Sequence, residues 1–208
     1  GDSWSTVAPL PVVATGGLLA VSEAGGPRAW AALDTAEGTQ LYRSDDAGAS
    51  WSFVRVLDDW WGALDASIRD PDVFAWGGVE VHRSIDAGAS FAVVNTWGEY
   101  YGDPASKLHA DIMGIDVVSD GTSETWYVAT DGGLYRSLDL LASVQNLTLI
   151  GMRVSQYYST LTSAADLDHI AAGSQDQGYQ RSSIAPPSGT TSFDFAQLIS
   201  GDYGHLSS

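Results

Sequence analysis

The hydrophobic and polar positions of this chain form many short runs separated by turn-forming residues. Each run is rich in β-branched, aromatic or small apolar side chains and is bounded by Gly, Pro, Asp or Ser, which is the pattern of strands joined by tight turns. No segment keeps a sustained 3.6-residue period, so we expect little helix. The pattern therefore predicts an all-β chain. The predicted strands are 18–23, 29–34, 40–44, 52–57, 63–69, 73–78, 80–84, 91–97, 111–118, 125–131, 133–137, 144–148, 154–163, 169–176, 178–183 and 192–199.

One motif recurs along these strands. The sequence YRSDDAGASW at 42–51 returns as HRSIDAGASF at 82–91, with the shared core Ser-x-Asp-x-Gly-x-Ser followed by an aromatic residue. A third copy begins at Ser137 and has Leu141 in place of Gly. Segment 181–193 resembles a fourth copy with a longer loop, and residues 1–4 resemble the second half of another. The chain is therefore built from an internal repeat.

Each repeat contains four predicted strands, and the motif falls between the third and the fourth. Four strands in a repeat of about 40–50 residues are the signature of a propeller blade. We therefore predict a β-propeller of four-stranded antiparallel blades, with about four blades in one domain at 1–208. The predicted blades span about 5–57, 58–97, 98–148 and 149–199, and 200–208 begins another.

The motif has a structural explanation. Its Ser and Asp side chains can accept hydrogen bonds from nearby backbone N–H groups, its Gly can take a positive φ, and its aromatic residue can pack between blades. A calcium loop is the alternative, but the motif lacks the spacing and the final Glu of an EF-hand, so no cofactor is predicted. The residues given this structural role are Ser44, Asp46, Gly48, Ser50, Trp51, Ser84, Asp86, Gly88, Ser90, Phe91, Ser137 and Asp139.

These motifs resemble the Asp-box, or BNR, repeats of sialidases, sortilin-type domains, xyloglucan-cleaving glycosidases and photosystem assembly propellers. Segments 109–111, 131–137 and 173–178 are similar to the secreted members in particular. The resemblance implies an extracellular or cell-surface setting, with the periplasm as an alternative. It also implies a ring of six or more blades, so that the chain is a fragment whose partners include further blades or domains of the same polypeptide.

The charge of the chain limits its partners. There are 26 Asp and Glu against 9 Lys and Arg, a formal net charge of −17. Such a surface repels phosphate backbones and anionic membranes, which argues against nucleic acid, but it suits neutral glycans, cations and basic proteins. No apolar run is long enough to insert into a membrane. There is no Cys, and the four His lack metal-ligand spacing, so we predict no metal site.

In a propeller the loops between second and third strands and between blades share the face opposite the repeated motif. Aromatic residues beside carboxylates on such a face suit a neutral glycan. Structural roles are the alternative: the two Trp can seal a blade junction, and His109 can be a hydrogen-bonded core residue. The ligand-binding candidates are Asp131, His109, Asp111, Trp60, Trp61, Tyr100 and Tyr101.

Three functions fit these observations. The leading hypothesis is a secreted or surface propeller that binds a glycan or a protein. The second is a glycoside hydrolase: the resemblance to xyloglucan-cleaving enzymes makes Asp176 the candidate general acid, with Asp34 or Asp131 as its partner. The third is a structural scaffold. A sialidase is disfavoured because Arg43, Arg83 and Arg136 each precede a motif copy and are explained by the repeat.

Overall fold

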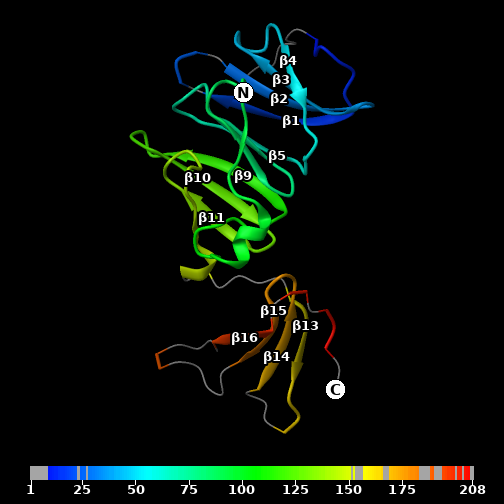
Figure 1. Cartoon of the computed structure of the whole chain (residues 1–208), viewed down its shortest axis with the longest axis vertical. Coiled ribbons are helices and arrows are strands. Elements are labelled where there is room, and N and C mark those ends of the chain that lie inside the picture. The colour runs from blue at the N-terminus through cyan, green and yellow to red at the C-terminus, as the bar shows by residue number, and fades with distance from the viewer. Residues whose placement is uncertain are drawn as a thin grey trace, which may run out of the picture. The chain divides into compact units, whose positions relative to one another are not determined.

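The computed structural model describes residues 9–22, 24–26, 28–150, 152, 157–165, 169–182, 188–189, 194–199, 201–202 and 204–206 (Figure 1). Its contacts form two compact units, 1–130 with 134–150 and 131–133 with 151–208. The motif copy expected at 1–4 lies outside the described residues, as does most of the copy at 181–193. No helix among the described residues is long and apolar enough to cross a membrane.

The described residues form four antiparallel sheets, each with four strands in chain order. This confirms the predicted all-β fold of four-stranded blades, about four in number. The first sheet contains β1 (Gly16–Ser22), β2 (Arg28–Thr35), β3 (Gly38–Ser44) and β4 (Ser52–Val56); the second β5 (Ala63–Ala66), β6 (Phe74–Gly77), β7 (Val81–Ser84) and β8 (Ala92–Val93); the third β9 (Ile112–Ser119), β10 (Glu124–Thr130), β11 (Gly133–Ser137) and β12 (Gln145–Asn146); and the fourth β13 (Tyr157–Thr162), β14 (Ile170–Ser174), β15 (Gly178–Ser182) and β16 (Phe195–Ile199).

The strands agree with the predicted ranges except at their ends, and β8 differs most. We predicted a strand over 91–97, but β8 ends at Val93 and a 3-10 helix, η1 (Trp97–Tyr101), follows. The Glu99 carboxylate accepts hydrogen bonds from the backbone N–H and the hydroxyl of Thr96, at 2.8 and 3.1 Å. This Thr-x-x-Glu pattern starts a helical turn and so ends the strand early. A second 3-10 helix, η2 (Thr148–Ile150), follows β12.

The first unit packs its sheets as propeller blades around an axis. Its three first strands are neighbours, because β1 contacts β5 and β5 contacts β9. All four residues of β6 are buried, since the second sheet has a neighbour on each face. Phe74 and Trp76 join the cluster shared with the first sheet, whereas Ala75 joins the cluster shared with the third. The Trp30 and Phe74 rings stack across the first interface with centroids 3.7 Å apart.

Three turns in this unit, which we call the box turns, share one hydrogen-bond pattern: 44–51, 84–91 and 137–144. In the first, Ser44 Oγ accepts the Gly48 N–H at 2.8 Å, and Asp46 accepts the backbone N–H and the hydroxyl of Ser50, both at 2.7 Å. The second and third turns repeat these bonds. In the third turn Leu141 occupies the Gly position at φ 63° and is buried, so the turn geometry persists where its Gly is lost.

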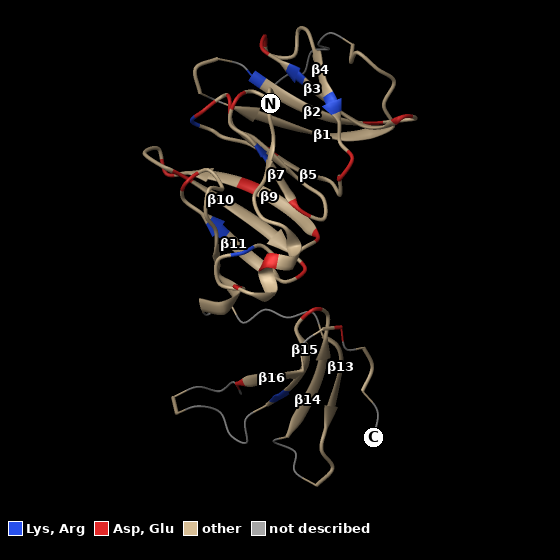
Figure 2. Ribbon diagram, viewed as in Figure 1, with Lys and Arg blue, Asp and Glu red and all other residues tan. Residues whose placement is uncertain are grey.

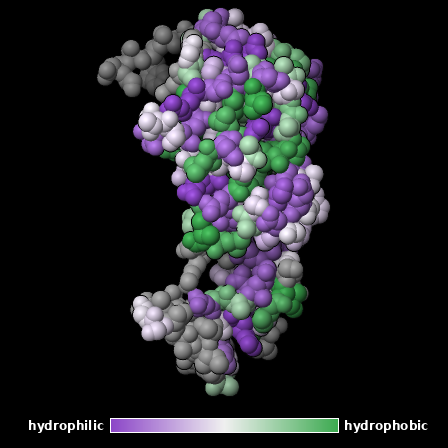
Figure 3. All heavy atoms as spheres, turned by 60° about the vertical axis from the view of Figure 1, so that its left-hand side comes forward, coloured by the Kyte–Doolittle hydropathy of each residue, from purple (hydrophilic) through white to green (hydrophobic). Residues whose placement is uncertain are grey.

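Arginines link successive box turns across the blade interfaces. Arg43, which precedes the first turn, donates from Nη1 to the Ala87 carbonyl of the second at 2.7 Å. Arg83 donates in the same way to the Leu140 carbonyl of the third at 2.6 Å. On the face seen in Figure 3, hydrophobic residues form separate patches among hydrophilic ones.

Candidate functional site

The first unit has two edges with different connections. Because the strands run antiparallel in chain order, the box turns lie at one edge. The opposite edge, which we call the loop face, is formed by segments 57–62, 78–80 and 94–111, which follow β4, β6 and β8. Six of the seven sequence-predicted ligand residues fall in these segments: Trp60, Trp61, Tyr100, Tyr101, His109 and Asp111, the last residue of the third segment.

Asp59 holds the first two segments together. Its carboxylate accepts the backbone N–H groups of Val79 and Glu80, at 2.7 and 3.1 Å, and lies 3.1 Å from His82 Nε2. Partial burial acts to raise the pKa of Asp59, but these hydrogen bonds outweigh it and leave the pKa below its ordinary value. Asp59 is therefore a carboxylate that fixes the turn at 78–80, and it is not free to bind a ligand.

The two adjacent tryptophans have different environments. Trp60 is partly buried and packs against the core cluster shared by the first two sheets. Trp61 is 50% exposed, and its backbone N–H is bound to the Gly77 carbonyl at 3.0 Å. The structure thus gives Trp60 a sealing position and leaves the Trp61 ring in solvent.

Three further aromatic residues, Trp97, Tyr100 and Tyr101, come from η1, and we call them the aromatic patch. Trp97 is 52% and Tyr101 60% exposed, and their ring centroids are 6.0 Å apart in an edge-to-face arrangement. Tyr100 lies edge-to-face against Tyr101 at 5.4 Å. Exposed rings in such mutual contact offer a preformed surface on which a ligand can stack.

Polar contacts hold the aromatic patch in place. The Trp97 backbone N–H donates to Glu80 Oε1 at 3.0 Å, which joins η1 to the turn that Asp59 fixes. The Lys107 ammonium lies 3.0 Å from Glu99 Oε1, and this contact, together with the Thr96 donors, lowers the pKa of Glu99. The backbone under the exposed rings is therefore bound on both sides, so little ordering entropy remains for a ligand to offset.

His109 and Asp111, at the end of the third segment, have different environments. His109 is only 5% exposed, and its ring lies edge-to-face against Tyr100 at 4.7 Å. Its Nδ1 is 3.1 Å from the Ala110 carbonyl, which favours the tautomer protonated at Nδ1. Asp111 has a φ of 64°, and its N–H donates to the Val79 carbonyl at 3.0 Å. His109 therefore lies under the patch, while Asp111 is partly exposed.

The remaining two sequence candidates belong to the second unit. Asp131 accepts a hydrogen bond from Gln175 Nε2 at 2.7 Å. Asp176 lies in the β14–β15 turn at φ 56°, and its backbone N–H donates to the Asp202 carboxylate at 3.0 Å. These contacts tie both residues to the second unit.

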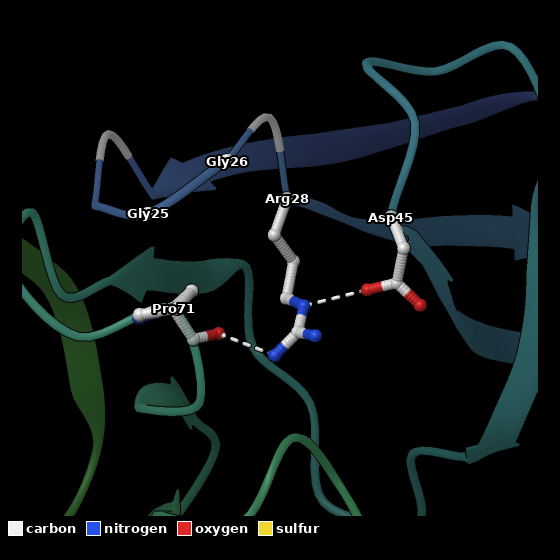
Figure 4. Close-up of a pocket in the computed structure, with 5 residues that line it drawn as sticks. All are labelled: Gly25, Gly26, Arg28, Asp45 and Pro71. Atoms are coloured by element: carbon white, nitrogen blue, oxygen red, sulfur yellow. Dashed lines mark hydrogen bonds and ion pairs between the residues drawn. The ribbon is translucent and has the colours of Figure 1, made fainter.

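A cavity of about 120 Å³ lies at the edge of the box turns and is lined by Gly25, Gly26, Arg28, Asp45 and Pro71 (Figure 4). The Arg28 guanidinium lies within it, 2.6 Å from Asp45 and 3.1 Å from the Pro71 carbonyl, and it also pairs with Asp72. Arg28 thus links the first two sheets by pairing with a carboxylate of each, so this cavity is a structural junction. The described residues contain no group of three or more His, Asp or Glu side chains that could hold a metal ion.

Sequence analysis did not assign roles to Glu80, Glu99 and Lys107, which hold the patch in place. A signal for one of them is present in the sequence, because Thr96-x-x-Glu99 is a helix-start pattern. No local pattern marks Glu80, because its partner Trp97 comes from a different connection, the one between β8 and β9.

No protein-family model and no curated protein matches the chain. Among solved structures it is similar to the GH74 enzyme of Niastella koreensis, with a TM-score of 0.47 and 12% identity over 79% of this chain and 27% of that chain. It is similar to YCF48 bound to D1 peptide, with a TM-score of 0.46 and 18% identity over 91% and 57%. The GH74 xyloglucanase of Xanthomonas campestris gives 0.46 and 16% over 88% and 31%. The chain spans less than two thirds of each of these proteins, and at these scores the likeness supports no statement about its ligand.

Proposed function

We propose that the chain is a binding module that recognises a glycan or a protein through the loop face of its first unit. The observation that carries the proposal is the aromatic patch: exposed rings in mutual contact, on backbone that Glu80 and Glu99 hold in place. Partly exposed rings on a preformed backbone are the usual contact residues of binding surfaces. We also propose an extracellular or cell-surface setting, which rests on the repeat resemblance alone.

The aromatic patch supports binding more directly than it supports glycoside hydrolysis. Hydrolysis needs two carboxyl groups about 5–9.5 Å apart across the scissile bond. Of the partners considered for Asp176, Asp34 belongs to the other unit and accepts the Thr39 hydroxyl at 2.8 Å within its own turn. Asp131 is hydrogen-bonded to Gln175. Each of these two carboxylates therefore already accepts a hydrogen bond from the chain itself.

A glycan array and a peptide array, each probed with the purified chain, test the proposal. The double variant Trp97→Ala, Tyr101→Ala removes the exposed rings. The control is Phe53→Ala, because Phe53 is an aromatic residue of similar exposure, 56%, on the outer strand β4. We expect binding that the double variant loses and the control keeps.

Three results would count against the proposal. Binding that survives the double variant would place the ligand elsewhere. Failure to bind any glycan or peptide, with stable docking to a neighbouring chain, would favour the scaffold alternative. Release of sugar from a β-glucan, abolished by Asp176→Asn, would restore the hydrolase hypothesis.

A further inference from the structure

The loop face combines exposed aromatic rings with a strong excess of negative charge. Segments 57–62, 78–80 and 94–111 contain six acidic residues and one lysine, a formal charge of −5. The acidic residues are Asp58, Asp59, Glu80, Glu99, Asp103 and Asp111. The lysine, Lys107, is paired with Glu99.

The arginines of the same unit lie mainly elsewhere. At the edge of the box turns, Arg28 begins β2 and Arg69 lies in the connection before β6. Three more arginines are the penultimate residues of the strands that lead into the box turns: Arg43, Arg83 and Arg136 (Figure 2). Four of these five, Arg28, Arg43, Arg69 and Arg83, donate a hydrogen bond to a backbone carbonyl of a neighbouring blade. These arginines offset part of the negative charge at the box-turn edge, where Asp45, Asp46, Asp70, Asp72 and Asp86 also lie, whereas the segments of the loop face contain a single cation, Lys107.

Some of these carboxylates are available to a ligand. The Asp58 side chain is 84% exposed, and its contact with Arg55 is long, at 3.7 Å. The Asp111 carboxylate accepts no hydrogen bond from another described residue, although its backbone is held. An exposed carboxylate thus lies in the connection that carries Trp61, and a second ends the connection that carries the aromatic patch.

The chain itself contains an example of the chemistry that such a surface favours. The Arg55 guanidinium lies 5.7 Å from the Trp76 ring centroid and 5.0 Å from that of Phe91, with Asp58 as its carboxylate partner. A cation over aromatic faces beside a carboxylate gains from both the ring quadrupole and the charge. The loop face offers the same two partners to a cation that comes from outside.

We propose that the ligand of the loop face is a protein segment carrying Lys or Arg side chains. The inference rests on the proposed function and names its ligand class. A neutral glycan could stack on the rings of the patch, but it would gain nothing from the negative field. An anionic ligand would be repelled. A guanidinium or ammonium group is attracted both by the aromatic rings and by the negative field, and the field also speeds its encounter with the loop face.

Fluorescence anisotropy with three matched peptides tests the inference. The first is a short Gly-Ser peptide that carries several Arg and Lys residues, and the others carry Gln or Glu at the same positions. We expect the basic peptide to bind at low salt and to weaken as salt rises, and the Gln peptide to bind at least about tenfold more weakly. The Glu peptide should not bind.

Matched variants separate a specific site from general attraction to an acidic chain. Trp97→Ala with Tyr101→Ala should weaken the basic peptide about five- to tenfold. Asp58→Asn with Asp111→Asn should weaken it and reduce its salt dependence, and Asn tolerates the positive φ at 111. Asp116→Asn is the control, because it removes an exposed charge from β9, outside the loop face.

Each remaining outcome overturns the inference. Equal binding of the basic and Gln peptides would remove the role of charge. Binding of the basic peptide that all variants leave unchanged would show only non-specific attraction. A glycan that binds and is lost in the Trp97, Tyr101 variant, while no peptide binds, would keep the proposed function and refute this ligand class. If neither glycan nor peptide binds, both proposals fail.

Discussion

Glu124 provides the sharpest test of how the blades are held together. It is 7% exposed, at the start of β10, and its carboxylate accepts hydrogen bonds from the second sheet's β5–β6 connection. The donors are the Ser67 hydroxyl at 2.7 Å and the backbone N–H groups of Ile68 and Arg69 at 3.0 and 3.2 Å. The Trp126 indole N–H adds a fourth bond at 3.0 Å.

Glu124→Gln keeps the shape of the side chain but replaces one acceptor oxygen with an NH₂ group. In one orientation this group faces the backbone N–H groups of Ile68 and Arg69, and in the other it faces the Ser67 hydroxyl and the Trp126 indole N–H. The second orientation costs less, because the Ser67 hydroxyl can donate to the remaining oxygen or accept from the NH₂ group, so only the Trp126 N–H loses its acceptor. Because a buried unsatisfied donor costs about 1–3 kcal/mol, we predict a loss of about 1–3 kcal/mol in the free energy of unfolding.

Denaturant unfolding followed by tryptophan fluorescence measures this loss. All eight Trp precede residue 130, so the signal reports on the first unit alone. Glu37→Gln, at an exposed turn, is the control and should change stability little. A loss below about 0.5 kcal/mol for Glu124→Gln, at an unchanged m-value, would refute the role given to this carboxylate.

Four further predictions concern the same unit. A Cβ at Gly77 would lie 2.4 Å from Ile112 Cγ2. Gly77→Ala should therefore lower the free energy of unfolding by about 1–3 kcal/mol, measured by thermal unfolding. An unchanged stability would contradict the close approach of β6 to β9. Arg83→Leu should lower the free energy of unfolding by about 1–2 kcal/mol, because it removes the hydrogen bond to the third box turn. Arg136→Leu should cost less, because it removes only an exposed hydrogen bond to the Gln145 side chain. Equal costs would argue against the link between box turns. Hydrogen bonds lower the pKa of the three box-turn aspartates, so their stabilisation is present above the ordinary value of 3.8 and is lost as pH falls through the lowered pKa. Burial raises the pKa of Asp65, so this group has the opposite effect on the pH dependence of stability. The wild type should gain stability from Asp65 as pH falls toward the ordinary value of 3.8. Unfolding measured at a series of pH values should show that Asp65→Asn lacks this gain.

The repeat made the fold predictable from the sequence. Strand order, blade number and the position of the box turns follow from a motif that recurs with four strand-like runs between its copies. The third box turn shows why the motif can be recognised when it is degraded. Ser137 and Asp139 keep the side-chain bonds, so the turn tolerates Leu141 where Gly is expected.

The site was predictable only in part, because its partners come from different connections. The aromatic residues and the loop face could be named from the order of the strands. However, the sequence does not say that Trp60 is partly buried while Trp61 is exposed, since both neighbours have the same chemistry. The contacts made by Glu124 and Glu80 join blades or connections far apart in the chain, and no local pattern encodes them.

Mapping backbone amide shifts by NMR while a basic peptide is added tests the central claim most directly. The account predicts shifts in residues 57–62, 78–80 and 94–111, which form the loop face around the aromatic patch. Shifts confined to the box turns at 44–51, 84–91 and 137–144 would contradict it, because the ligand would then bind the edge that we assign to structure alone.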